Sequence, residues 1–107
     1  MGLQIHSFEL IVMLSVLRLG GDAYGVPIRE EMERRLGGGA KVPVGSVYAT
    51  LVRLQAKGWL KARLGEATAE RGGRAKTYFE VTGRGLQEVR RSRQTLLNFW
   101  EGIPDLR

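Results

Sequence analysis

The side chains with the clearest capacity for chemistry lie in the stretch 44–60 and in the basic segment after it. Ser46 and Thr50 carry hydroxyls and Arg53 carries a guanidinium, and all three can donate hydrogen bonds to phosphate oxygens or to base edges. Gly45 has no side chain, so it would permit close approach to a phosphate backbone. This combination suits contact with a nucleic acid better than catalysis.

Catalysis and metal binding have no comparable set of residues. The single histidine, His6, has no second histidine, cysteine or acidic cluster at ligand spacing, and the chain contains no cysteine. Ser46 and Ser92 have no histidine base nearby in the sequence. The acids in 30–33 are crowded on one expected helix instead of forming a separated pair. We therefore expect no catalytic residues, no metal site and no cofactor.

The composition indicates one folded domain with a basic surface. The 107 residues carry a formal net charge of +6, and 43% of them are hydrophobic. Residues 1–43 have five basic and five acidic residues, whereas 44–81 have seven against three, for a charge of +4. The excess charge therefore lies near the central stretch, as an anionic partner would require. No apolar run approaches the roughly 20 residues that span a bilayer, and no signal-peptide pattern opens the chain, so we expect a cytoplasmic protein.

The stretch 44–57 has the apolar spacing of a short helix. Val47, Leu51 and Leu54 recur at i, i+4 and i+7, which places them on one packing stripe. The hydroxyl and guanidinium residues of this stretch fall on other faces, which we expect to be free for contact. Gly58 follows the last periodic residue, where a left-handed conformation would end the helix.

Two strand candidates follow the central helix, at 59–64 and 76–81. The connecting segment, 65–75, is long for a hairpin loop and rich in small residues. Its Arg71 and Arg74 would give the hairpin a basic tip, although such charges often serve only solubility.

Two helices are expected ahead of the central one. The first, from Ser7 to Leu19, has Ser7 as a plausible N-cap and leaves almost no polar face. We expect it to be buried on all sides, partly by a second subunit, with a simple core helix as the alternative. The second, from Tyr24 to Leu36, has a mixed-charge side that we expect to face solvent, Glu31 included.

The last helix is expected to run from Thr82, a good N-cap, to about Gly102. Its apolar residues recur at steps of three and four, which is typical of a helix that packs against another helix. We interpret it as a dimerisation arm, with docking onto its own chain as the alternative. The dimerisation residues predicted on the first and last helices are Leu10, Leu14, Leu86, Val89, Leu96 and Trp100.

The order helix, helix, helix, strand, strand predicts a mainly α fold with a small β-hairpin. We expect a winged helix-turn-helix over 1–82 and a C-terminal dimerisation helix over 83–107. In such a fold the third helix enters the major groove of double-stranded DNA, and the hairpin touches flanking phosphates. Tyr48 would either contact DNA or be a half-buried core aromatic. The predicted DNA-binding residues are Gly45, Ser46, Tyr48, Thr50, Arg53, Arg71, Arg74 and Lys76.

Three separated motifs resemble the PadR family of bacterial transcriptional regulators. They are SVYATLVRL at 46–54, KGWL at 57–60 and GRAKTYFEVTGRG at 73–85. The first two helices also fit, including Tyr24 and Gly25, and the short C-terminal part is similar to the PadR subgroup with one helix after the wing. Two positions depart from the pattern. Pro43 stands where a capping Ser or Thr is common, and Ala49 replaces a frequent proline.

The resemblance implies a homodimeric repressor that binds a palindromic operator. By position in the motifs, Tyr48 would contact a phosphate, and Arg74 and Lys76 would serve the wing. Some family members resemble drug or phenolic-acid sensors that hold a planar aromatic ligand at the dimer interface, here between Phe99 and Trp100. The competing interpretation is a winged-helix protein-interaction module without sequence-specific DNA binding.

Overall fold

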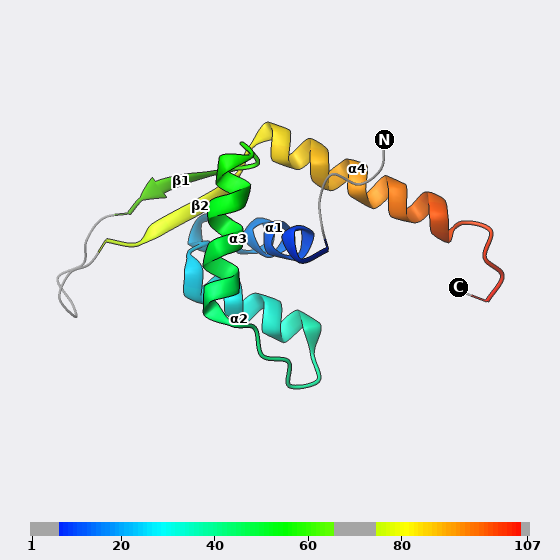
Figure 1. Ribbon diagram of the computed structural model, residues 1–107, viewed down its shortest axis with the longest axis horizontal. Coiled ribbons are helices and arrows are strands. Elements are labelled where there is room, and N and C mark those ends of the chain that lie inside the picture. The colour runs from blue at the N-terminus through cyan, green and yellow to red at the C-terminus, as the bar shows by residue number, and fades with distance from the viewer. Residues whose placement is uncertain (1–6, 66–74, 106–107) are drawn as a thin grey trace.

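The computed structural model describes residues 7–65 and 75–105. Within them the chain forms four α-helices and one two-stranded antiparallel hairpin, which confirms the predicted mainly α fold (Figure 1). His6, Arg71 and Arg74, each of which carries a prediction, lie outside the described residues. The elements in order are α1 (Ser7–Leu19), the 3-10 turn η1 (Gly20–Asp22), α2 (Gly25–Leu36), α3 (Val44–Ala56), β1 (Leu60–Leu64), β2 (Thr77–Val81) and α4 (Gly83–Trp100).

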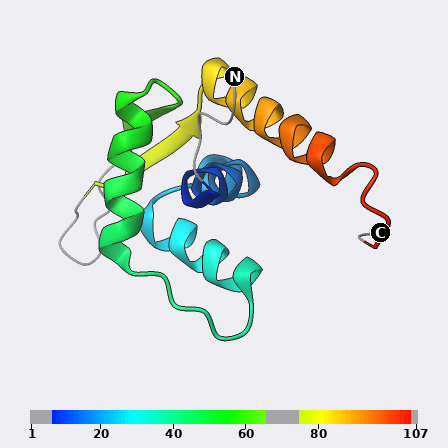
Figure 2. The same cartoon turned by 45° about the vertical axis from the view of Figure 1, so that its right-hand side comes forward.

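Helix α1 is the centre of the fold. Figure 2 shows it nearly end-on, with α2, α3, β2 and α4 arranged around it. Val12 and Met13 are fully buried, but Leu14 and Leu17 are each 41% exposed. No described element of the same chain covers the flank that carries these leucines, so α1 is not the simple core helix of the alternative expectation. The helix also begins at Ser7 itself, which is its first residue and not its N-cap.

Helix α2 begins one residue later than expected, because Tyr24 is extended and takes the N-cap position. The expectation that Glu31 faces solvent was wrong: its side chain is only 6% exposed. Arg34 and Arg35, one turn further along the helix, both donate to its carboxylate. These two long side chains cover Glu31 and keep their own charged ends in water.

Helix α3 packs through the predicted stripe, since Val47, Leu51 and Leu54 are fully buried. Pro43 is its N-cap and supplies no side-chain hydrogen bond. Gly58 has a φ of 79°, and the N–H of Trp59 donates to the carbonyl of Leu54. The predicted glycine ending is therefore confirmed.

The two strands pair with Leu60 opposite Val81 and Leu64 opposite Thr77. The N–H of Phe79 also donates to the carbonyl of Ala23 at 2.7 Å. The segment just before α2 is thereby tied to the hairpin, and the winged helix-turn-helix is held as one unit.

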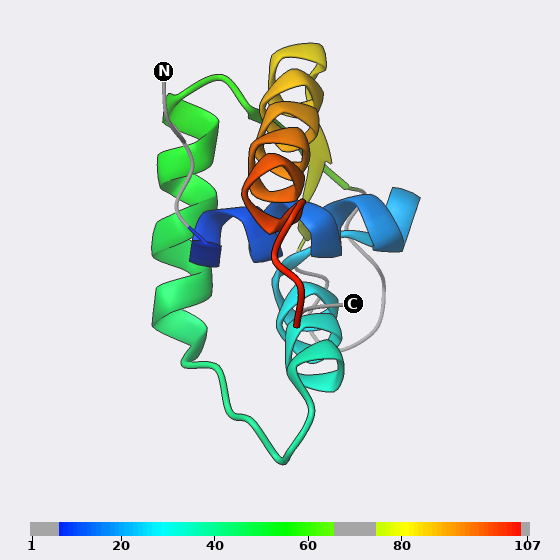
Figure 3. The same ribbon diagram turned by 90° about the vertical axis from the view of Figure 1, so that its right-hand side faces the viewer.

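Helix α4 begins as predicted after Thr82, whose hydroxyl accepts from the N–H of Gly85 and donates to the carbonyl of Gly58. Its first half packs on the body, where Val89 and Ser92 are buried. Its second half extends away from the other elements (Figure 1), and Figure 3 views the helix from that end. Trp100 is 53% exposed there.

Candidate nucleic-acid interface

The outward face of α3 consists of small or apolar residues. Gly45 has no other side chain near it, Ala49 is exposed, and Val52 is 64% exposed. Ser46, also exposed, lies beside these outward-facing residues. Ala49 and Val52 were missing from the predicted contact set, although the 100° step of a helix places them opposite the buried stripe. A helix with short outward side chains can approach a groove closely.

Tyr48 is packed on one side and accessible on the other. Its side chain is 46% exposed. The far end of its ring also lies directly on Gly25, where an added Cβ would collide with the phenol. The missing side chain of Gly25, at the start of α2, therefore leaves the space that the Tyr48 ring occupies. One edge of the ring stays accessible.

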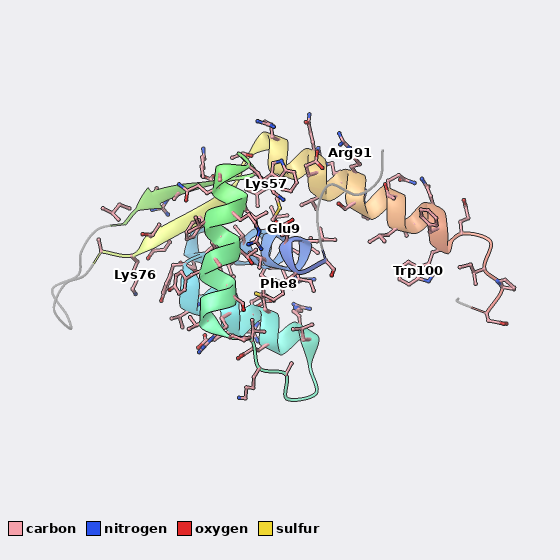
Figure 4. All side chains as sticks on the ribbon, in the orientation of Figure 1. Phe8, Glu9, Lys57, Lys76, Arg91 and Trp100 are labelled. Carbon is pink, nitrogen blue, oxygen red and sulfur yellow. The ribbon has the colours of Figure 1, made fainter. Side chains whose placement is uncertain are left out.

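The flank of α3 that faces α1 carries a charged network. The Nε of Arg53 donates to Glu9 at 3.1 Å, and its Nη2 donates to the hydroxyl of Thr50 at 3.1 Å. The Nζ of Lys57 lies 3.0 and 3.2 Å from the two carboxylate oxygens of Glu9. Figure 4 shows Glu9 and Lys57 close together between the two helices. Thr50 is only 2% exposed, so placing it on a free face was wrong. It packs between the buried stripe and this network.

The entry to α3 is fixed from α2. Glu33 Oε2 accepts a hydrogen bond from the N–H of Val42 at 2.7 Å, and Val42 itself is buried. The carbonyl of Pro43 then accepts from the N–H groups of Ser46 and Val47. Glu33 thus supplies an anchor near the place where the sequence lacks a capping side chain. No local pattern signals it, because the pair is separated by the glycine connector 37–39.

Aromatic and basic side chains contact one another at the loop end of the hairpin and the start of α2. The rings of Tyr24 and Tyr78 meet edge to face at 5.4 Å. The Nζ of Lys76 lies 4.5 Å above the Tyr24 ring and donates to its hydroxyl at 3.3 Å. The guanidinium of Arg63 lies 4.6 Å from the Tyr78 ring. Lys76 remains exposed at the hairpin edge (Figure 4), and Arg63 is a basic residue that the predicted set omitted.

The sequence compares directly with a known family. A family model described as "Transcriptional regulator PadR-like family" matches residues 13–91, which cover the second half of α1, the first half of α4 and every described element between them. The chain belongs to the PadR-like family. No curated protein has a sequence that matches the chain.

Solved structures share the fold of this PadR-like chain. A transcriptional regulator from Clostridium thermocellum is 19% identical, with a TM-score of 0.71 and coverage of 92% of this chain and 90% of that one. A PadR family transcriptional regulator from Eggerthella lenta is 22% identical, with a TM-score of 0.67 and coverage of 90% and 80%. Their likeness confirms the winged-helix architecture.

An apolar groove of about 350 Å³ lies between α1 and the extended half of α4. Five of the six predicted dimerisation residues line it, and Leu86 does not. Of the two predicted effector-binding aromatics, Trp100 lines the groove, whereas Phe99 is 78% exposed and does not. The expected pair of aromatics is therefore not brought together within one chain. The lining residues are Leu10, Leu14, Val89, Arg93, Leu96, Leu97 and Trp100.

Over 7–65 and 75–105, no group of three or more histidine, cysteine or acidic side chains is placed to hold a metal ion. Within the same part of this PadR-like chain, no helix is both long and apolar enough to cross a membrane.

Proposed function

We propose that this PadR-like transcriptional regulator is a cytoplasmic repressor that binds a palindromic operator as a homodimer. Operator occupancy would itself block transcription. The observation that carries the proposal is the exposed face of α3, which has short side chains and lies beside the half-exposed Tyr48. Such a face is suited to close approach within a major groove.

The proposed DNA contacts come from two elements. Gly45, Ser46 and Tyr48 on α3 would meet the groove and its edge. Lys76, at the hairpin edge, would contact a flanking phosphate, because phosphate contacts from basic side chains position a protein on the duplex. Arg71 and Arg74 belong to the same proposed wing and lie outside the described residues. Thr50 and Arg53 are left out of this set, because both are engaged in the network with Glu9.

The proposed dimer uses the groove between α1 and α4. Leu14, Leu96 and Trp100 are each more than a third exposed in the single chain. A second copy would remove this apolar surface from water, which is the main favourable term in association. In the proposed domain division, 1–82 binds DNA and 83–107 supplies the arm. The two copies of α3 would then reach half-sites about one DNA turn apart.

We also propose that a planar aromatic effector releases the protein from its operator. Trp100 lines an apolar groove of a size that could hold a small aromatic molecule. We expect the tryptophan fluorescence of the dimer to change when such a compound binds. The change should disappear in Trp100→Phe, whose remaining tryptophan, Trp59, is buried. Unchanged emission across a panel of planar aromatics would remove these compounds from the proposal.

The first test is an anisotropy titration against the DNA immediately upstream of the protein's own gene, at two salt concentrations and with competitor DNA. A repressor should show competitor-resistant binding that weakens as salt rises. Tyr48→Ala combined with Lys76→Ala should abolish it. Arg91→Ala, which removes an exposed cation from α4, serves as the control and should leave it nearly unchanged.

The alternative is a winged-helix interaction module. It predicts no competitor-resistant binding to any duplex and no effect of the Tyr48 and Lys76 substitutions on DNA. If the protein does not bind the upstream DNA, selection of bound sequences from a random DNA pool decides between a different operator and the interaction module.

A further inference from the structure

Between Val44 and Lys57 the only charged residues are two cations, Arg53 and Lys57. Neither lies on the outward face of α3. Both turn toward α1 and donate to one carboxylate, that of Glu9, at distances of 3.0 to 3.2 Å. The positive charge that the sequence assigns to the recognition helix is therefore already in contact with an anion of the same chain.

Glu9 is held firmly in this arrangement because its side chain is only 1% exposed. A buried carboxylate needs charged or hydrogen-bonding partners, and losing them is costly. The two cations differ from it, since the side chains of Arg53 and Lys57 are 51% and 33% exposed. Lys57 has a second contact within the chain, 4.8 Å from the ring of Trp59. Moving either cation to a DNA phosphate would weaken the hold on a buried anion.

We propose that Glu9 withholds Arg53 and Lys57 from DNA phosphates and is thereby a specificity residue. The inference rests on the proposed DNA binding. With both cations held by one anion, α3 has a weaker sequence-independent attraction for a duplex than its two basic residues alone would give. Discrimination between operator and other DNA then depends on the outward face of the helix and on the wing.

The test measures how binding depends on salt, which a purely structural role of Glu9 would not alter in a defined direction. The homodimer and its Glu9→Gln variant are titrated by anisotropy on a selected operator and on an unrelated duplex. Gln keeps the size of the side chain but removes its charge. Each released cation should steepen the slope of log K against log salt by about 0.9, so Glu9→Gln should add up to about 1.8 per subunit.

The same variant should bind the unrelated duplex roughly tenfold more tightly at low salt, while the operator gains less, so that the specificity ratio falls. Glu101→Gln is the matched control. It makes the same change in net charge at an exposed site just beyond α4, and it should leave both slopes unchanged. The triple variant Glu9→Gln, Arg53→Gln, Lys57→Gln should return to the slope of the unaltered protein.

A second pair of variants tests the proposal even if Glu9→Gln does not fold. With Glu9 present, Arg53→Gln and Lys57→Gln should each leave the salt slope unchanged. A loss of about 0.9 per subunit in either variant would mean that the cation contacts a phosphate in the complex, and the inference would be overturned. An unmoved slope in folded Glu9→Gln would overturn it equally. If the unaltered dimer binds no duplex specifically, the proposed function itself fails, and the role of Glu9 fails with it.

Discussion

Two acidic side chains of α2 show how neighbouring residues of one type can have different structural roles. Glu31 is paired within its own helix, with Arg34 and Arg35. Glu33 reaches across the glycine connector to the N–H of Val42. The first pairing follows from i, i+3 and i, i+4 spacing, whereas the second exists only because the chain turns back on itself.

The pairing of Glu31 makes stability depend on pH. The hydrogen bond from Arg35 is the largest influence that lowers the pKa of Glu31 below 4.5, and burial opposes it. Because the pKa is lower in the folded state, the ionised carboxylate stabilises the fold at pH values above the unfolded pKa. This contribution is lost as the pH falls through the folded pKa. We expect the difference in unfolding free energy between the protein and Glu31→Gln to be present at neutral pH and to shrink in acid. Urea unfolding at a series of pH values checks this, and a difference independent of pH would contradict it.

The bond from Val42 to Glu33 should stabilise the entry to α3. Glu33→Ala leaves the buried N–H of Val42 without this acceptor, and we expect it to lower the unfolding free energy by about 1–2 kcal/mol. Glu33→Gln keeps an oxygen acceptor and should lose less than half of that. Chemical denaturation of both variants measures the difference. Equal losses would indicate that the charge of Glu33 matters and the hydrogen bond does not.

At the scale of elements, the hairpin and α4 are joined by a close backbone contact at Gly85, in the first turn of α4. Gly85 faces the carbonyl of Trp59 so closely that a Cβ there would overlap with it, and it would also lie 2.9 Å from the Met13 side chain. Thr82 caps α4 at the same place and bonds back to Gly58. The start of α4 is therefore fixed to both α1 and the turn after α3.

Two glycines of α4 allow a matched test of this junction. Gly85→Ala should lower the unfolding free energy by about 2 kcal/mol or more, because backbone must shift to admit the methyl group. Gly83→Ala, where a Cβ meets nothing within 4 Å, should be neutral or stabilise by about 0.5 kcal/mol. Urea unfolding of the pair supplies the comparison. Similar losses at both positions would show that helix-start glycines matter for another reason than close packing.

At the scale of the whole molecule, one chain leaves an apolar face uncovered along α1 and the outer half of α4. Leu14 is 41% exposed and Leu96 is 39% exposed, and both line the same groove. The nearly continuous apolar sequence of α1 is explained if two faces pack internally and a second subunit covers the third. Helix α4 would then be stable at its outer end only in the dimer.

This view leads to a test of oligomeric state. We expect Leu14→Asp and Leu96→Asp to shift the protein from dimer to monomer at micromolar concentration, because each places a charge in an apolar interface. Leu36→Asp makes the same change at an exposed site at the end of α2 and should stay dimeric. Analytical ultracentrifugation distinguishes the species. If the unaltered protein is a monomer at that concentration, the proposed dimer is contradicted.

Local pattern determined most of the elements in this protein. The 3.6-residue period, the Thr82 cap and the glycine at position 58 predicted the helices, and the structure confirms them to within a residue or two. The family motif at 46–54 also lies within α3. This success has a physical basis, because helix periodicity and capping depend on neighbours in the sequence.

Tertiary structure alone decided which polar residues are free. Glu9 is 44 residues from Arg53 and 48 from Lys57, yet it engages both and turns them from the expected DNA face. Thr50 is buried beside this network, and Glu33 reaches Val42 across the connector. A sequence gives the type and spacing of a charged side chain. Its partner depends on how helices distant in the chain pack against each other, and that packing determines whether the charge remains available to DNA.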